Sequence, residues 1–367
     1  MGLPVRIASI NPQTGSPNWE TDIGVPISAI TGSAKQFTAL TTQGAVYTFD
    51  AKAFDGKQPI QQVENLGGNE LNMKFTNPVQ LKDGRLLVMN SEKADSMLLV
   101  DPSKSRSLSK MIAVSFGEAK PSNDLLAVGN NVIVPLSNAQ LAMFDPDKGQ
   151  QVGIPFQPTV RAGEIPKWLN PIVLADGQSI VIADTQRSMY KLSTNRQLRT
   201  VIQQDLERPL KGRLSVLSNT VVAVSANDSG DQLDFFDGIE LKRFASLPVE
   251  GRFAWGPYVA TGQTDSLVVV LSDIEGLVAV DESGKRRWST PLEREEFVDK
   301  PIVIENDVIV GTSRGDLLRF SLTDGKMIGK TTVGQPLSAS PLQVGKGLLI
   351  PCDEGSIVTL PLPAAKD

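Results

Sequence analysis

The chain has 367 residues, of which 36 are lysine or arginine and 41 are aspartate or glutamate, so its formal net charge is −5. This balance leaves no basic footprint and argues against nucleic acid or an anionic membrane surface as partners. The absence of histidine removes the commonest general base and the commonest zinc ligand, and a single cysteine excludes an intramolecular disulfide.

The first predicted element covers residues 5–23. These residues read as two strands joined by the turn residues 11–15, NPQTG, because Asn, Pro and Gly favour tight turns.

From residue 26 onward the chain repeats one unit, which residues 300–326 show most clearly. This segment contains three short apolar runs, residues 301–304, 308–312 and 316–320, separated by Asn, Asp and Gly. β-branched residues at alternating positions, interrupted in this way, predict three strands joined by two hairpins. A lone three-stranded ribbon cannot bury both faces, so the unit requires neighbours like itself.

Two markers recur in phase along the chain. A proline opens the first run of each of eight units, at a mean spacing of about 45 residues, which is near the period of a four-stranded propeller blade. An apolar residue followed by Asp or Ser closes the third run. The prolines are Pro26, Pro78, Pro121, Pro171, Pro209, Pro257, Pro301 and Pro341, and the closing pairs are Phe49-Asp50, Val100-Asp101, Phe144-Asp145, Leu192-Ser193, Phe236-Asp237, Val280-Asp281 and Phe320-Ser321.

The pattern predicts an all-β fold, an eight-bladed β-propeller of four-stranded antiparallel blades, with seven blades as the alternative. An array of helical pairs is disfavoured because no stretch shows sustained helical spacing free of Gly and Pro. A β-sandwich also has proline-punctuated strands, but two markers in phase favour the propeller.

We expect residues 1–367 to form a single domain, closed by the N-terminal strands of residues 5–23 against the C-terminal strands of residues 337–362. The last unit has three strands, and residues 17–23 would supply its outer fourth strand. Residues 5–10 are then one strand too many. They either flank the ring or are part of a longer chain, and the sequence leaves both alternatives open.

Residues 9–19, SINPQTGSPNW, resemble the blade motif Ala-x-Asp-x-x-Thr-Gly-x-x-x-Trp of the quinoprotein (PQQ) dehydrogenase-like propellers, and residues 279–288 are a second copy, one residue shorter. Residues 320–326 and 144–149 keep the turn without the Trp. The resemblance implies a ring in which the Trp docks on the neighbouring blade. In layout the chain resembles the non-catalytic, eight-bladed BamB lipoproteins of outer-membrane β-barrel assembly, although the lipobox cysteine of that family is absent.

The resemblance implies two function classes. A PQQ-dependent dehydrogenase would need a general-base Asp, a Ca²⁺ site, an aromatic platform and, in many members, a vicinal disulfide. Carboxylates are expected on the rim at Asp184, Asp273, Asp353 and Glu354, but one cysteine and 5% aromatic residues argue against this class. We therefore expect no enzyme, no catalytic residues, no cofactor and no metal. The favoured class is a scaffold in the cell envelope that mediates protein-protein interaction, with a sensor or adhesion domain of a larger protein as the alternative.

Four insertions interrupt the repeat, at residues 65–74, 158–168, 226–232 and 291–300. Inter-blade connections and loops between second and third strands leave a blade on the same face, so we expect all four insertions on one rim, where binding sites commonly lie. Arg and Trp are favoured at interface centres. We predict partner contacts from Arg161, Glu164, Lys167 and Trp168, with Arg187 and Arg314 on hairpins of the same face. For Trp168, packing between blades is the alternative.

The first residues, MGLPVRIASINP, contain no charged region followed by a long apolar core, so we expect no signal peptide in this sequence. The protein is then cytoplasmic, or a leader has been removed, and the resemblance alone favours a periplasmic or other exported location. We expect a monomer with an unidentified protein partner and no transmembrane segment. Cys352, at the end of a second strand, is expected to be a small buried core residue.

Overall fold

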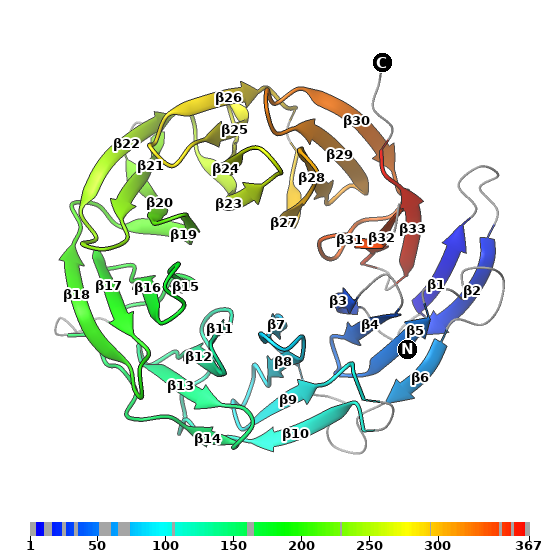
Figure 1. Ribbon diagram of the computed structural model, residues 1–367, viewed down its shortest axis with the longest axis horizontal. Helices are drawn as coiled ribbons and strands as arrows, with labels where there is room; N and C mark the ends of the chain where they lie inside the picture. Colours follow the sequence, from blue (N-terminus) through cyan, green and yellow to red (C-terminus); the bar gives the residue numbers. More distant parts are fainter. Residues whose placement is uncertain are drawn as a thin grey trace.

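The computed structural model describes residues 5–10, 17–23, 27–32, 36–50, 60–64, 74–104, 107–159, 165–227, 230–293, 295–344, 347–353 and 356–363. These residues contain strands and no helix. The strands form eight sheets arranged in a ring around a central axis (Figure 1), which confirms the predicted eight-bladed β-propeller. In the described ranges no helix is long and apolar enough to cross a membrane.

Each regular blade is a meander of four antiparallel strands, here called a to d from the axis outward. Blade 1 contains β3 (Ile27–Gly32), β4 (Gln36–Thr41), β5 (Val46–Asp50) and β6 (Ile60–Glu64). Blade 2 contains β7 (Val79–Gln80), β8 (Leu86–Met89), β9 (Ser96–Val100) and β10 (Ser109–Ala113). Blade 3 contains β11 (Leu126–Val128), β12 (Asn131–Pro135), β13 (Leu141–Asp145) and β14 (Gln150–Gln151). Blade 4 contains β15 (Ile172–Val173), β16 (Ser179–Ala183), β17 (Ser188–Ser193) and β18 (Arg199–Asp205).

The other half of the ring continues this order. Blade 5 contains β19 (Leu210–Leu217), β20 (Thr220–Asn227), β21 (Gly230–Asp237) and β22 (Arg243–Val249). Blade 6 contains β23 (Phe253–Thr261), β24 (Ser266–Ser272), β25 (Gly276–Val280) and β26 (Arg286–Thr290). Blade 7 contains β27 (Phe297–Ile304), β28 (Asp307–Thr312), β29 (Asp316–Ser321) and β30 (Met327–Thr332). Blade 8 contains β31 (Leu342–Val344), β32 (Gly347–Pro351) and β33 (Ile357–Pro361).

Blade 8 differs from the others because the N-terminal hairpin adds two strands to it. β1 (Val5–Ile10) pairs in parallel with β33, with Ala8 opposite Val358, and β2 (Pro17–Ile23) is the outermost strand of the sheet. We expected residues 17–23 beside the C-terminal strands, whereas residues 5–10 lie there. Like any strand d, β2 leads into the inner strand of the next blade and therefore runs antiparallel to β33. Its hairpin partner β1 must then be parallel to β33.

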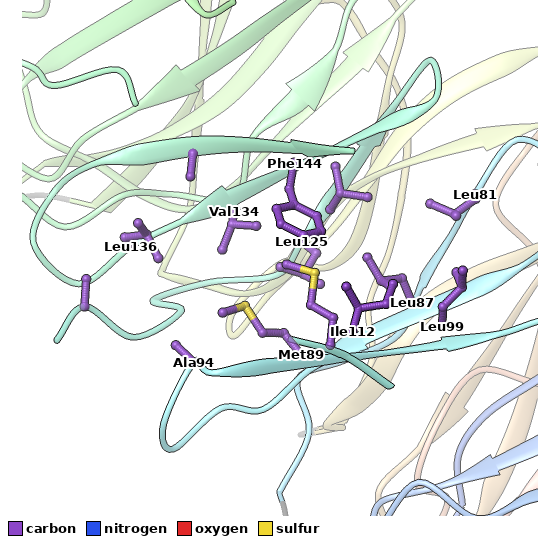
Figure 2. Packing of buried hydrophobic residues seen from close by; sticks show 14 residues of the cluster. Leu81, Leu87, Met89, Ala94, Leu99, Ile112, Leu125, Val134, Leu136 and Phe144 are labelled. Carbon is purple, nitrogen blue, oxygen red and sulfur yellow. The ribbon is translucent and has the colours of Figure 1, made fainter. Parts of the chain in front are cut away.

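The hydrophobic core is divided among the junctions between successive blades. Each buried cluster combines residues of two neighbouring blades. Figure 2 shows the cluster between blades 2 and 3, where Met89 packs with Val134 and Phe144. At the junction of blades 8 and 1, Phe37 and Leu349 belong to one cluster. Core packing therefore closes the ring at the junction where the two ends of the repeat meet.

The Asp or Ser that follows strand c caps the next turn, as the sequence predicted. Asp281 Oδ1 accepts hydrogen bonds from the backbone N–H groups of Ser283 at 3.0 Å and Lys285 at 3.1 Å. Asp145 Oδ1 accepts in the same way from Asp147 and Lys148. These bonds satisfy turn N–H groups that no strand partner reaches, which explains the recurrence of the marker.

The tryptophan of the blade motif docks on the next blade. Trp288 of β26 is 7% exposed, and its Nε1–H donates to the carbonyl oxygen of Leu322 in blade 7 at 2.8 Å. The indole ring covers Gly325 so closely that a Cβ at this position would collide with it. Gly325 also has a φ of 74°, which a glycine adopts without strain. The turn glycine and the Trp of the preceding blade thus form one joint.

Candidate interaction surface

The turns between strands b and c and the connections between blades lie on one face of the ring, here called the upper rim. The meander topology requires this. Strands alternate in direction, so strands b and d both run toward the same face, and the b–c turn and the connection to the next blade both begin there. In several blades the last residue of strand b is a buried polar side chain that caps the b–c turn. Thr312, with no exposed surface, accepts a hydrogen bond from the N–H of Asp316 at 3.0 Å, and Ser272 accepts from Ile274 and Glu275.

Two of the carboxylates considered for an enzyme, Asp184 and Asp273, accept hydrogen bonds from backbone N–H groups on this rim. Asp184 is 3% exposed, and its Oδ1 accepts from the N–H groups of Gln186 and Ser188. Asp273 Oδ1 accepts from the N–H of Arg252 at 2.6 Å. Asp353 is exposed, and Glu354 lies outside the described residues. Within the part of the chain that the structure describes, no group of three or more acidic or cysteine side chains could hold a metal ion.

The predicted contact residues divide between two places on the upper rim. Lys167 and Arg187 are exposed and close together on blade 4, because the carbonyl oxygen of Lys167 accepts from Thr185 at 3.0 Å in the turn that carries Arg187. Arg314 is exposed on the b–c turn of blade 7, three blades further round the ring. Arg161 and Glu164 lie outside the described residues.

Trp168 is not exposed on the rim. It is 3% exposed and packs between blades 3 and 4, with its ring centroid 6.1 Å from Phe156 and 5.9 Å from Tyr190. Its backbone pairs with Asp184 at the start of the inner strand of blade 4. The packing alternative therefore describes this residue, and a shortened loop has to end before it.

The connection between blades 3 and 4 instead exposes two isoleucines that sequence reasoning missed. Ile154 is 78% exposed and precedes the segment that was predicted to bind, and Ile165 is 67% exposed and lies within it. Each is followed by a proline, Pro155 and Pro166. An apolar residue beside proline in a long connection has no strand neighbour that would bury it, and this was the available signal.

The b–c insertion of blade 5 is a raised hairpin and not a loop. β20 and β21 stay paired up to Asn227 and Gly230, so this hairpin is longer than its counterparts. The fully buried carboxylate of Asp231 fixes its base: Lys211 Nζ and Arg252 Nη1 form ion pairs with it, and the N–H of Phe253 donates at 2.8 Å. Burial alone would raise the pKa of Asp231, but these partners outweigh burial and lower it.

A second polar region surrounds the axis. Strand pairing places one residue of every inner strand at a comparable level. In blades 2 to 8 this residue lies two positions before the inner strand pairs with strand b, and in blade 1 the corresponding Ala29 is itself paired with Leu40. In all eight blades this position is half-buried or exposed, and the inner strands that carry it surround the central axis in Figure 1. We call these residues the axial belt: Ala29, Asn77, Asp124, Asn170, Arg213, Gly256, Lys300 and Ser340.

Polar contacts at or beside the belt join neighbouring blades. Asp124 accepts from Asn77 Nδ2 and Asn170 Nδ2, both at 2.9 Å, which links blades 2, 3 and 4. Arg213 lies over the ring of Tyr258, with Cζ 4.2 Å from the centroid, and links blades 5 and 6.

The remaining side of the belt is held by neighbours of the belt residues. Trp255 Nε1 donates to the carbonyl oxygen of Asp299, and Ser340 Oγ donates to the Asp299 carboxylate at 2.7 Å, which links blades 6, 7 and 8. The sequence signal was the polar residue directly before proline in four units: Asn77, Asn170, Lys300 and Ser340.

Cys352 is fully buried, as the sequence predicted. The detected cavities are small. One of about 150 Å³ lies on the lower face between blades 2 and 3, next to Arg85, whose guanidinium is held by Asp83 and Asp147. Such volumes accommodate water or a very small molecule.

Residues 218–360 match a family model described as outer membrane protein assembly factor BamB. A search of curated proteins finds no match for the chain. Among solved structures, the chain is similar to BamB from Moraxella catarrhalis, with 17% identity over 90% of this chain and 95% of that chain and a TM-score of 0.64.

Two further structures extend the comparison. Sqt1 from Saccharomyces cerevisiae has 11% identity over 92% of this chain and 96% of that chain, with a TM-score of 0.70. The dihydro-heme d1 dehydrogenase NirN in complex with DHE has 12% identity over 92% of this chain and 75% of that chain, with a TM-score of 0.64. At these identities the likeness shows the fold alone. The chain is an eight-bladed β-propeller of the PQQ-like type, and its residues 218–360, from blade 5 to blade 8, carry the repeat of the BamB family model.

Proposed function

We propose that the chain is a non-catalytic scaffold that binds a protein partner in the cell envelope through the upper rim at the connection between blades 3 and 4. The observation that carries the proposal is the exposure of Ile154 and Ile165 on this connection. Isolated exposed isoleucines are common on protein surfaces. Here two of them lie on one long connection, which also carries the exposed cation Lys167, and the exposed cation Arg187 lies on the adjoining blade 4.

An apolar contact beside basic side chains suits a partner segment that carries apolar and acidic residues. Burying each isoleucine would contribute about 1.5–3 kcal/mol, and the cations would orient the partner and select against basic surfaces. The cell envelope enters the proposal through the BamB family match over residues 218–360.

The test begins with a partner captured from cell extract by the wild-type protein and identified. The double variant Ile154→Asp and Ile165→Asp should then bind it at least about thirtyfold more weakly, which corresponds to about 2 kcal/mol. Its free energy of unfolding should change by no more than an ordinary surface substitution does, about ±0.5 kcal/mol.

Two matched variants locate the effect. Ile239→Asp changes an isoleucine that is 64% exposed on the opposite face, and Ile274→Asp changes one that is 66% exposed on the upper rim of blade 6. Both should bind the partner normally. Equal loss in Ile274→Asp would place the contact elsewhere on the rim, and full affinity in the double variant would refute the proposed site.

The non-catalytic part of the proposal has a separate test. NirN, a dehydrogenase, shares the fold, so the enzyme alternative is addressed directly. Incubation with PQQ and Ca²⁺ should give neither tight binding nor dye reduction with alcohols or sugars. PQQ-dependent turnover would overturn the proposal. Its support is a sequence without histidine and with one cysteine, together with the structural use of Asp184 as a turn cap.

A further inference from the structure

The axial belt separates its charges in an unusual way. On the side of blades 2, 3 and 4 the belt residues are an amide, a carboxylate and an amide, and the Asp124 carboxylate is bonded to both amides. On the side of blades 5, 6 and 7 the belt residues are Arg213, Gly256 and Lys300. One cation therefore lies on each side of blade 6, which contributes a glycine, and so no side chain, at this level.

Neither cation is neutralised by the protein. Within the described ranges, no carboxylate forms an ion pair with Arg213 or Lys300, whereas Arg85, Arg243 and Arg319 each pair with an acid. The Nε of Arg213 is buried without a hydrogen-bond partner. Hydrogen bonds between charged partners are stronger than neutral ones, so this unpartnered donor favours an added anion.

The guanidinium is also held in place for a ligand. Contact with the Tyr258 ring, with Cζ 4.2 Å from the centroid, orients the plane of Arg213. A planar guanidinium can bind a carboxylate through two parallel hydrogen bonds, and the Nε–H of Arg213 has no partner within the protein. The nearby acid Asp299 is bonded to blade 8, because its carboxylate accepts from the N–H and Oγ–H of Ser340.

We propose that the axial belt binds a small organic acid with two carboxylates, one at Arg213 of blade 5 and one at Lys300 of blade 7. The belt lies inside the ring below the upper rim, on the innermost strands, which favours a small molecule over a folded partner. The site is separate from the connection between blades 3 and 4, so it does not depend on the proposed partner-binding surface.

Succinate and citrate are the probes, and acetate is the comparison with a single carboxylate. Isothermal titration calorimetry should show saturable binding of at least one of the two polyacids, tighter than acetate. Trp255 contacts Tyr258, with centroids 4.7 Å apart, so its fluorescence should change with the same midpoint. The fluorescence change should disappear in Trp255→Phe.

Substitutions identify the binding groups. Arg213→Gln and Lys300→Gln should each weaken binding about tenfold or more, and Arg213→Lys should retain part of it. Arg314→Gln, which removes an exposed cation from the rim of the same blade as Lys300, should bind the acid normally. Should Arg213→Gln fail to fold, Lys300→Gln tests the proposal alone, because that side chain is exposed.

Three results would overturn the proposal: no saturable binding of succinate or citrate at millimolar concentrations, unchanged affinity in both glutamine variants, or equal loss in Arg314→Gln. An acidic peptide can be titrated in the same way. If the peptide bound tightly and neither free acid did, the two cations would belong to a site for a protein partner, and the small-molecule site would be refuted.

Discussion

At the scale of single residues, Asp231 has the most demanding environment among the charged side chains described. Its carboxylate has no exposed surface and accepts from Lys211, Arg252 and the backbone of Phe253. An unpaired buried charge would be expensive, but two cations and a backbone donor satisfy this one. Since Asp231 begins the ladder of the raised hairpin, its ion pairs tie blade 5 to the connection that leads into blade 6.

Asp231→Asn should destabilise the protein by about 1–3 kcal/mol at neutral pH. The buried site loses the charged acceptor of these bonds, whereas Lys211 and Arg252, which are 36% and 49% exposed, remain partly solvated. Urea unfolding followed by circular dichroism measures this. Glu240→Gln, which removes an exposed ion pair with Lys242, is the control and should cost no more than about 1 kcal/mol.

The effect of Asp231→Asn should depend on pH in a defined direction. The folded pKa of Asp231 is lowered, so its contribution is complete above the unfolded value of about 3.9 and is lost as pH falls through the folded pKa. The difference between wild type and variant should therefore be constant near neutrality and shrink in strong acid. A difference that grows on acidification would contradict this account.

At the scale of elements, the joint between blades depends on the turn after strand c. Trp288 of blade 6 presses on Gly325 of blade 7, and its Nε1–H is satisfied by Leu322. Burial of a tryptophan contributes more apolar area than any other side chain. Gly325 is therefore favoured for two reasons: its backbone has a positive φ, and the indole ring of the neighbouring blade leaves no room for a Cβ.

Gly325→Ala measures the cost of the positive φ and of the clash with the indole ring together, and Gly334→Ala measures the cost of the positive φ alone. Both glycines have positive φ, 74° and 84°, but a Cβ at Gly334 meets nothing within 4 Å. Gly334→Ala should cost about 1–2 kcal/mol for the left-handed conformation. Gly325→Ala should cost a further 1–3 kcal/mol or so for displacing the indole ring. Thermal unfolding with tryptophan fluorescence measures both, and equal losses would mean that the ring moves aside freely.

At the scale of the whole molecule, two devices close the ring. The buried cluster between blades 8 and 1 joins their inner strands, and the N-terminal hairpin covers the outer edge of β33. The hairpin has the register of a regular c–d pair, since Ser9 faces Trp19 as Ala279 faces Trp288, with an irregularity at the same place. Packing thus holds the ring shut, and the hairpin protects an edge that would otherwise be free to pair.

Deletion of residues 1–23 should therefore leave the β-sheet circular dichroism spectrum in place while lowering the melting temperature by at least about 5 °C, since 1 kcal/mol corresponds to about 2–4 °C in domains of 150–250 residues. The exposed edge of β33 should also promote association, which light scattering detects. The matched control removes residues 1–4 only. An unfolded deletion variant would mean that the hairpin, and not the core between blades 8 and 1, closes the ring.

The sequence by itself determined the features that repeat locally: the number of blades, the Asp caps after strand c, the docking of the motif Trp, and burial of Cys352. The blade count, the caps and the burial of Cys352 follow from a local pattern that recurs in phase, and the docking of the Trp followed from the resemblance of its motif to a known family. The proline marker is less regular than the sequence predicted. Five of the eight prolines share one position on the inner strand: Pro78, Pro171, Pro257, Pro301 and Pro341. In blades 3 and 5 Leu125 and Leu214 occupy this position.

Tertiary structure decided the rest. Trp168 is buried because Phe156 and Tyr190 pack against it at the junction of blades 3 and 4. Ile154 is exposed because no neighbouring side chain covers it. The axial belt exists because inner strands about 45 residues apart in the sequence converge on one axis. β1 is parallel to β33 because the strand that follows the hairpin fixes the direction of both its strands. These outcomes depend on which distant residues come together, and that information is absent from the local pattern.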